Sequence, residues 1–416
     1  MKNKILTYIS VCLLFAVGLM QAQTTNEGEF IVSENTILST LGAFENTPTG
    51  TFYNDGDTYI YKGFNNEGIV DFTQETGLTR FVGSQSQNLS GSQPSYFYDI
   101  LFDNTSQSTP FLLSGEFDVF GSVDFYNGVV DNKNYEGTLI FEENTTHFNT
   151  SDYSHVNGPV QKFGEEEFTF PIGEEGYYRF SGIAAPKSLD LFISEYYFEN
   201  SDNNYPHHLR EGVIQNINNQ EYWTIEHPDL EGGDSQQFIT LSYREETTPE
   251  EFMQAAEEDL LTIVRWDEET NMWIDEGGTV NQEDQTITTT VDKFEVFTLA
   301  TLDADLVQPC HIVVYNAVTA NGDGVNDHFR LEDEGDCAED LHVKIYNRWG
   351  VKVFESRNYG PESGEVFDGF STGRLTVKEE KNLPDGTYFY TLEYQYDAGT
   401  EFKKHKQAGY LYLSGH

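Results

Sequence analysis

The sequence predicts an all-β protein with an N-terminal β-solenoid-like region followed by a central β-sandwich. Aromatic residues make up 14% of the 416 residues, and the 31 Phe and 25 Tyr favour strands. Short aromatic or β-branched runs alternate with Asn and Gly, a pattern typical of short strands joined by tight turns. The expected parts are the solenoid-like region at 24–173, the sandwich at 174–302, an acidic linker at 303–309 and a further domain at 310–416.

The charge balance narrows the classes of partner. The 23 Lys and Arg stand against 70 Asp and Glu, which gives a formal net charge of −47. Such a surface repels phosphate backbones and anionic lipid within the screening length. We therefore expect no nucleic-acid binding, and divalent cations are the favoured small partners.

The first 23 residues indicate a secretory signal peptide. Lys2 and Lys4 form the basic start, residues 9–20 form the apolar stretch, and Ala22 is a small residue that favours cleavage near Gln23. This stretch is shorter than the ~20 apolar residues of a spanning helix, and no later segment approaches that length. We therefore expect no membrane-spanning segment in the mature chain.

Two cysteines remain after signal cleavage. Cys12 leaves with the signal peptide, whereas Cys310 and Cys337 form an even pair in an exported chain. We expect a disulfide between them, which would stabilise the fold by roughly 3–4 kcal/mol.

The region at 24–173 contains a weak internal repeat. Phe52, Phe64 and Phe125 each begin a short string that contains Asn and ends in Gly, and these Asn and Gly residues are expected to supply positive φ at corners. Stacked coils of a β-solenoid explain the repeat. The expected strands lie at 58–61, 69–72, 79–82, 96–102, 119–125 and 138–141.

The central region has longer, antiparallel-looking runs that predict a β-sandwich. These runs lie at 189–193, 221–225, 238–243, 261–266, 286–291 and 294–301. One short helix is expected within it, with Thr248 as the N-cap, Pro249 at the first helical position and the end near Glu258.

Signatures of catalysis are weak, so a non-enzymatic protein is expected. The sequence contains no HExxH, Walker or dinucleotide motif, and its one GxSxG string, at 369–373, lies in a turn-rich segment. The glutamates at 165–167 and 174–175 are more typical of a solvated edge than of glycosidase carboxylates. A metal or sugar site on the sandwich is the alternative, from His207, His208 and His227 with Trp223, Trp266 and Trp273.

The C-terminal region carries motifs in a fixed order. They are NAVTANGDGVNDHF at 316–329, IYNRWG at 345–350, VFE at 353–355, FDG at 367–369, LPDGTYFY at 383–390 and GYLYL at 409–413. Together they resemble the gliding motility-associated C-terminal domain, also called the type B sorting domain, of the Bacteroidetes type IX secretion system. Val318, Ala320 and Phe367 stand where that family usually has Phe, Pro and Trp, which indicates core and turn variation.

The resemblance covers about residues 310–416 and implies an Ig-like β-sandwich that directs export. The implied partners are the type IX translocon and its outer-membrane shuttle, and the implied location is extracellular or at the outer-membrane cell surface. The remainder of the chain only loosely resembles β-rich exported proteins of Bacteroidetes. The basic run at 403–406 is expected to protect a strand edge or, alternatively, to contact an acidic surface.

One acidic loop of this domain is a candidate calcium site. Asn321, Asp323, Asn326 and Asp327 gather oxygens around two glycines, and the two carboxylates would repel each other unless a cation neutralised them. The alternative is a turn held by hydrogen bonds from side chains to the backbone, without an ion.

The expected role is that of an adhesin accessory or adaptor for a larger cell-surface adhesin, in gliding or surface attachment. Only ~290 residues precede the sorting domain, which is short for a repeat-built adhesin. The alternative is a secreted carbohydrate-active enzyme or a sugar-binding module with the same export domain, because an export domain does not define the passenger's task.

Overall fold

The computed structural model describes residues 23–106, 109–186, 188–228, 236–307, 310, 312–333, 335–347, 351–371, 383–397 and 402–414. The predicted signal peptide lies outside these residues apart from Gln23. The chain divides into two compact units. Unit 1 comprises Met1–Leu139 with His147–Asn149, and unit 2 comprises Ile140–Thr146 with Thr150–His416.

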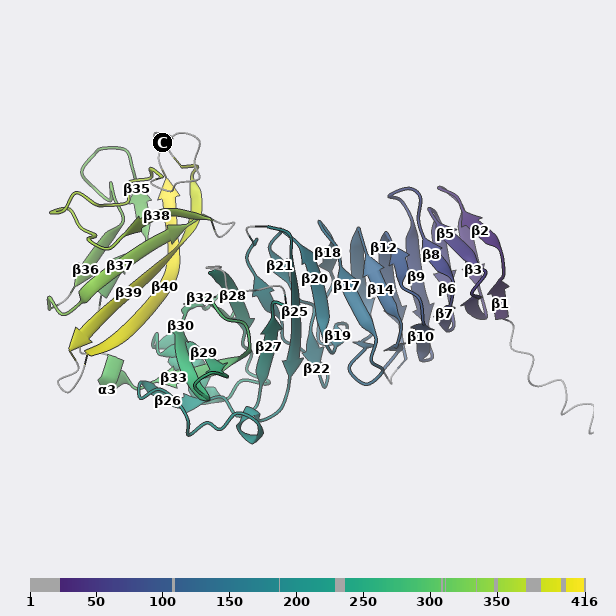
Figure 1. The fold of residues 1–416 in the computed structure, drawn as a ribbon, viewed down its shortest axis with the longest axis horizontal. Coiled ribbons are helices and arrows are strands. Elements are labelled where there is room, and N and C mark those ends of the chain that lie inside the picture. The colour runs from purple at the N-terminus through teal and green to yellow at the C-terminus, as the bar shows by residue number, and fades with distance from the viewer. Residues whose placement is uncertain are drawn as a thin grey trace, which may run out of the picture. The chain divides into compact units, whose positions relative to one another are not determined.

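Unit 1 is a β-solenoid whose short strands stack in parallel on three faces (Figure 1). Face A contains β1 (Gln23–Asn26), β4 (Ala43–Asn46), β7 (Phe64–Asn66), β10 (Gln87–Gly91), β13 (Phe111–Leu113) and β16 (Val130–Asp131). Face B contains β2 (Glu29–Val32), β5 (Thr51–Asn54), β8 (Ile69–Asp71), β11 (Ser95–Phe97) and β14 (Glu116–Val119). Face C contains β3 (Ile37–Thr40), β6 (Asp57–Ile60), β9 (Leu78–Gly83), β12 (Asp99–Asn104) and β15 (Ser122–Asn127). The solenoid prediction is therefore confirmed.

The inside of the solenoid is held by side-chain ladders. Asn26 donates from Nδ2 to Asn46 Oδ1 at 2.9 Å, and Asn46 donates in the same way to Asn66 Oδ1 at 2.9 Å. The Phe44 and Phe64 rings stack with centroids 5.9 Å apart. Because parallel strands place equivalent positions one coil above another, buried polar groups satisfy each other from coil to coil.

Two of the glycines in the repeat are required for a different reason from the one predicted. Gly128 has a φ of 113°, as expected, but Gly56 and Gly68 do not lie in the positive-φ region. A Cβ at Gly56 would lie 2.6 Å from the carbonyl oxygen of Ser33, and one at Gly68 would lie 2.3 Å from that of Gly50. These glycines are therefore required because neighbouring coils approach closely, and the positive-φ explanation is wrong for them.

In unit 2, one sheet continues from coil strands into the central sandwich. β17 (Thr138–Phe141) pairs in parallel with β20 (Val160–Gly164), and β20 pairs antiparallel with β25 (Asp190–Tyr197). The sheet then runs through β27 (Tyr222–Glu226), β33 (Val296–Leu302), β29 (Leu261–Asp267) and β30 (Met272–Gly277), and β26 (Ile214–Ile217) also pairs with β33. The pairing of β20 with β25 therefore joins parallel strands and antiparallel strands in one sheet.

A second sheet of five strands completes the sandwich. Its order is β21 (Phe168–Thr169), β24 (Ser181–Ile183), β28 (Gln237–Ser242), β32 (Thr286–Val291) and β31 (Thr279–Asn281). The shorter elements of this unit are β19 (Val156–Asn157), β22 (Gly173–Glu174), β23 (Tyr177–Tyr178), the 3-10 helix η1 (Ser201–Asn203) and α3 (Ala304–Val307), which lies in the predicted linker. β18 (Thr146–Phe148) belongs mainly to unit 1, where it lies next to β15 on face C.

The predicted helix is present as α2 (Glu250–Glu257), but its first residues differ from the prediction. Pro249 occupies the cap position, and no side chain caps the helix. The Thr248 hydroxyl instead donates to Glu221 Oε1 at 2.5 Å. The prediction of Thr248 as N-cap is therefore wrong, because a buried carboxylate takes its hydroxyl.

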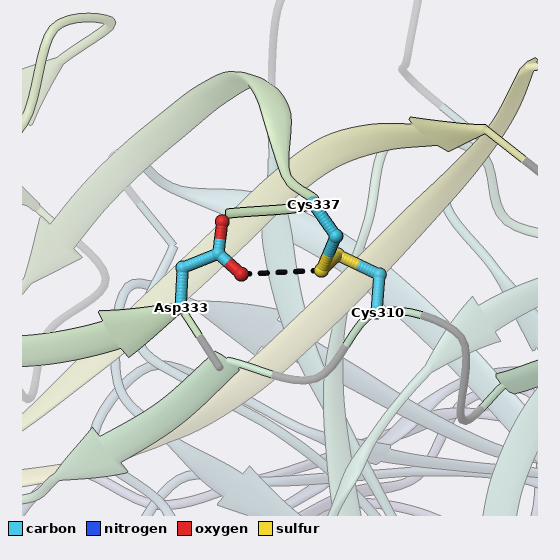
Figure 2. Close-up of side chains that lie close together, drawn as sticks. All are labelled: Cys310, Asp333 and Cys337. Carbon is cyan, nitrogen blue, oxygen red and sulfur yellow. Dashed lines mark hydrogen bonds between the residues drawn. A yellow bond between two sulfur atoms is a disulfide. The ribbon is translucent and has the colours of Figure 1, made fainter. Parts of the chain in front are cut away.

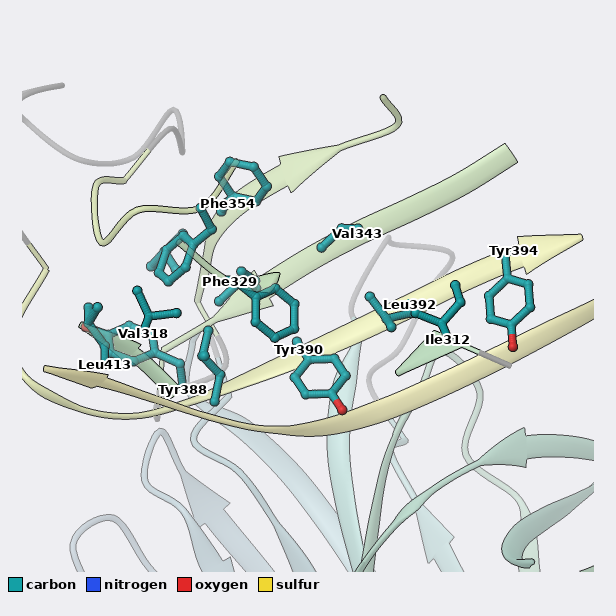
Figure 3. Packing of buried hydrophobic residues seen from close by; sticks show 14 of the residues in the cluster. Ile312, Val318, Phe329, Val343, Phe354, Tyr388, Tyr390, Leu392, Tyr394 and Leu413 are labelled. Carbon is teal, nitrogen blue, oxygen red and sulfur yellow. The ribbon is translucent and has the colours of Figure 1, made fainter. Parts of the chain in front are cut away.

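The C-terminal domain places a five-stranded sheet beside a two-stranded one. The larger sheet has the order β35 (Ala317–Thr319), β40 (Phe402–Ser414), β39 (Gly386–Asp397), β37 (Glu339–Tyr346) and β38 (Lys352–Ser356), and the smaller pairs β34 (Ile312–Tyr315) with β36 (Arg330–Asp333). Val318, Phe329 and Leu413 are among the buried side chains between them (Figure 3). The all-β prediction is confirmed, and Val318 and Phe367 are core residues.

Candidate functional site

Cys310 and Cys337 form a disulfide in the C-terminal domain, as predicted (Figure 2). Their Cα atoms are 5.4 Å apart, and the bond joins positions separated by 27 residues. Asp333, at the end of β36, places Oδ1 3.1 Å from Cys337 Sγ and accepts the Ala338 N–H with Oδ2 at 2.9 Å. The bridge and this carboxylate together fix the segment between β36 and β37.

The same three side chains also have the residue types of a metal-binding group. Metal binding requires thiolates, whereas these two sulfur atoms are bonded to each other. In the oxidised domain the group is therefore a structural bridge with a carboxylate that holds a turn.

The loop at 321–327 is a tightly hydrogen-bonded turn. Asp327 accepts the Gly322 N–H with Oδ1 and the Gly324 N–H with Oδ2, both at 2.7 Å. Asp323 accepts the Val325 N–H at 2.8 Å and the Asn321 side-chain amide at 3.0 Å. The loop thus brings the predicted residues together.

Asn326 completes this loop through its backbone. It adopts a φ of 54°, and its carbonyl accepts the Thr319 N–H at 2.7 Å. Each carboxylate oxygen that accepts one N–H keeps a second lone pair. The loop therefore stands as a turn by itself and could still offer oxygens to a cation.

The basic run at 403–406 contributes a contact within unit 2. Lys406 Nζ lies 3.4 Å from Glu276 Oε2, and it also donates to the Thr290 carbonyl. The side chains of Lys403 and Lys404 lie outside the described residues. Lys406 on β40 therefore anchors the C-terminal domain to the sandwich strands β30 and β32.

A cavity of about 460 Å³ lies beside Lys406 and is lined by opposite charges. Two ion pairs at or next to it join Lys344 to Glu393 at 3.0 Å and Lys406 to Glu276 at 3.4 Å. His342 Nε2 lies 2.8 Å from Glu355 Oε1, and burial lowers the pKa of His342. Burial raises the pKa of Glu211, although the Asp275 N–H that Glu211 accepts at 2.9 Å opposes this rise. These paired charges are typical of a polar interface within the unit.

The candidate sugar and metal residues of the sandwich belong to its core or to local hydrogen bonds. Trp223 and Trp273 are fully buried, and Trp266 is 6% exposed. The Trp223 indole donates to the Arg179 carbonyl at 3.0 Å, and the Trp273 indole donates to that of Tyr205 at 3.1 Å. These three rings therefore have no free face for a sugar.

The predicted histidine group is dispersed among different surroundings. His207 Nε2 lies 2.8 Å from the Ser201 hydroxyl, whereas the His208 side chain is exposed. His227 lies against the rings of Phe192 and Phe294, with centroids at 4.5 and 5.4 Å.

The weak catalytic candidates also have structural partners. Glu166 pairs with the buried Lys162 at 2.9 Å, and Glu174 accepts the Phe198 N–H at 2.7 Å. Burial alone would raise the pKa of Glu166, but the Lys162 ammonium holds it below its ordinary value. Ser371 of the GxSxG string is buried and donates to the Val353 carbonyl at 3.2 Å, while positions 372–373 lie outside the described residues.

Sequence reasoning missed a buried carboxylate, Glu221, that joins the sandwich to the segment before α2. It accepts hydroxyls from Thr248 at 2.5 Å and Tyr196 at 2.8 Å, and the Asn218 amide at 3.2 Å. Burial raises the pKa of Glu221 despite these donors. Its surroundings are side chains of the core, which indicates a structural role.

Sequence reasoning also missed a cluster of aromatic residues on the solenoid, of which Tyr96 and Phe120 are exposed and Phe72 and Tyr98 are half-buried. Phe72, Tyr98 and Phe120 lie at the corner between faces B and C, and Tyr96 lies next to them on β11. They follow the strand ends of successive coils, but coil length varies from one turn to the next. Only the strand register brings them together.

The comparisons with known proteins identify the C-terminal domain. Residues 312–413 match the CHU_C type IX secretion signal domain, which confirms the sorting-domain resemblance. No curated protein and no solved structure matches the chain. Across the part of the chain that the structure describes, no helix has the length and apolar character needed to cross a membrane. The protein therefore carries a type IX secretion signal domain at its C-terminal end and is exported by that system to the cell surface or the extracellular space.

Proposed function

We propose that the exported protein is a non-enzymatic attachment protein of the cell surface, acting as an accessory or adaptor for a larger adhesin. The observation that carries this proposal is the construction of unit 1. Its ladders of Asn and Phe hold the coils in fixed register, so outward side chains repeat along each face in columns. A rigid array of this kind suits binding to an extended partner.

The surroundings of the candidate catalytic groups favour this proposal over an enzyme. Glu166, Glu174 and Ser371 each have a partner within the fold, and the three sandwich tryptophans described above are core residues. The runner-up is a secreted carbohydrate-active enzyme, and turnover of a polysaccharide by the purified protein would favour it.

The partners of the C-terminal domain are proposed from the export route. The translocon of the type IX system and its outer-membrane shuttle would recognise the folded domain, whose core includes Phe329, Tyr390 and Leu413. Calcium at the loop of Asp323 and Asp327 is a further proposal. The ion would use the second lone pairs of oxygens that already accept N–H groups.

The test combines a deletion with recovery of partners. Removal of residues 310–416 is expected to leave the remainder in the periplasm, whereas the full-length chain at matched expression reaches the surface. The full-length chain is then recovered from cell envelopes by affinity, and the chains that co-purify are identified. An adhesin that is recovered with it supports the adaptor role. Recovery of a solitary monomer would contradict the adaptor role, and surface display of the truncated chain would contradict export through residues 310–416.

A further inference from the structure

We propose that the corner between faces B and C of the solenoid binds an uncharged polysaccharide. This inference rests on the proposed attachment function and names the class of its ligand. The surface is defined by Tyr53, Asp71, Phe72, Tyr96, Tyr98 and Phe120, and is called the aromatic corner below.

Three rings form the spine of the aromatic corner. Phe72 follows β8, Tyr98 lies between β11 and β12, and Phe120 lies between β14 and β15. The Phe72 centroid lies 5.7 Å from that of Tyr98 and 5.5 Å from that of Phe120. Each ring follows the last residue of its face-B strand, so the chain turns there and successive coils place the rings side by side.

A fourth ring extends this spine onto face B. Tyr96 lies 6.0 Å from Phe120 between centroids, and both side chains are 38% exposed. A ring with this exposure is fixed on one side by its neighbours and open to solvent on the other. Burying rings of this kind on a ligand contributes both area and geometric specificity.

A column of alternating Tyr and Asp lies beside the rings. Tyr53 on β5 is opposite Asp71 on β8, and the pairing of Ser95 with Val70 places Tyr96 opposite Asp71 on the other side. Neighbouring strands are about 4.8 Å apart, so these three side chains are closely and evenly spaced. The residues next to Tyr53, Asp71 and Tyr96 in the sequence are buried, namely Phe52, Val70 and Phe97. Because side chains alternate along a strand, the column faces outward.

The chemistry of the corner favours an uncharged sugar polymer. Apolar ring faces suit the C–H faces of sugar rings, while phenol hydroxyls and a carboxylate can bond their hydroxyl groups. The net charge of −47 and Asp71 itself disfavour a polyanion. Outward side chains on three successive coils also suit a linear ligand that lies along the stack, whereas a stable protein partner would need about 800 Å² of surface.

The experiment uses the purified mature full-length chain and three classes of polymer. Cellulose and a β-1,3-glucan are the uncharged probes, alginate is the anionic one and chitosan is the cationic one, each at low and high salt. We expect retention on at least one uncharged polymer, with little dependence on salt. Tyr96→Ala with Phe120→Ala is expected to weaken retention about tenfold, the usual scale for loss of an aromatic anchor.

The control is Tyr153→Ala, which removes a tyrosine that is 82% exposed elsewhere in the chain and should leave retention unchanged. Tyr96→Ala alone tests the site without altering the contact between Phe72 and Phe120, and circular dichroism verifies that each variant folds. Absence of retention on every uncharged polymer, equal retention by variant and control, or binding only to a charged polymer that salt abolishes would each overturn the proposal. Failure of the adaptor role would appear in the recovery from envelopes and not in this assay.

Discussion

Removing one amide from the solenoid ladder is expected to destabilise unit 1 measurably. Asn46 is fully buried, donates to Asn66 Oδ1 and to the Ile69 carbonyl at 2.9 Å each, and accepts from Asn26 at 2.9 Å. Asn46 Nδ2 also donates to the Gly50 carbonyl at 3.3 Å, and that carbonyl keeps the Ile69 N–H at 3.0 Å. Asn46→Ala therefore removes four bonds and leaves a small cavity. A buried polar group without its partner costs about 1–3 kcal/mol.

The expected size of the effect follows from what the partners retain. Asn26 still donates to the Thr51 carbonyl at 3.1 Å, and Asn66 Oδ1 still accepts the Gly68 N–H at 3.0 Å. The full penalty therefore applies mainly to the Ile69 carbonyl, with a smaller part for the two amides. Together with the cavity, we expect a loss of about 2–3 kcal/mol in the free energy of unfolding.

Urea unfolding followed by far-ultraviolet circular dichroism measures this loss. Asn88→Ala is the matched control, because Asn88 is an exposed asparagine on the same face and surface changes stay within about 0.5 kcal/mol. All 4 tryptophans lie at position 223 or later, so an unchanged native tryptophan fluorescence verifies that unit 2 is intact. Equal losses for Asn46→Ala and Asn88→Ala would refute the ladder argument.

Three further predictions concern unit 2. Reduction of the Cys310–Cys337 disulfide should lower the free energy of unfolding by roughly 3–4 kcal/mol, because the bond closes a loop between residues 27 positions apart. Two thiols that are alkylated without reduction, in an intact-mass measurement, would contradict the presence of the bond. Asp327→Asn should lower the free energy of unfolding by about 1–3 kcal/mol, because the amide nitrogen replaces one of the two oxygens and cannot accept the N–H of Gly322 or Gly324. A higher melting temperature with calcium in the wild type but not in Asp327→Asn would support the calcium proposal, whereas equal melting in calcium and chelator would remove it. Burial holds the pKa of His155 below its ordinary value, so the unfolded chain binds the proton first and stability should fall as pH drops below about 6.5, by at most about 1.4 kcal/mol per unit. His155→Gln should flatten this slope, and a pH profile identical to that of the wild type would count against it.

The sequence was sufficient where a local pattern decides the structure. The strands at 138–141 and 286–291 match β17 and β32 at both ends, because alternation and β-branching are properties of the segment itself. The disulfide followed from cysteine number and export. The sequence was insufficient where a distant group decides the structure, as at Thr248, whose hydroxyl is taken by Glu221 from another element.

The candidate site illustrates the same limit for aromatic residues. Tryptophan is the usual first choice for a sugar platform, but Trp223 and Trp273 are buried, and their indole N–H groups have carbonyl partners inside the fold. No local pattern distinguishes Phe72 or Phe120 from the core phenylalanines of neighbouring coils. Their exposure depends on being one position beyond the strand end, and that position is set by the register of the coil.

The charge of the chain and its exposed aromatic residues lead to one consistent account of binding. A net charge of −47 favours solubility and repels polyanions, but it contributes nothing to the affinity for an uncharged polymer. Affinity for such a ligand must therefore come from contact area and hydrogen bonds at a surface that is fixed before binding, because a mobile surface would lose entropy on ordering. The register that places Tyr96 against Phe120 provides that fixed surface.

Loosening the ladder at Asn46 should consequently weaken retention on the uncharged polymer even though Asn46 is buried and lies away from the rings, and Asn88→Ala should leave retention unchanged. Retention that is unaffected by Asn46→Ala while stability falls would show that the corner binds without support from the ladder.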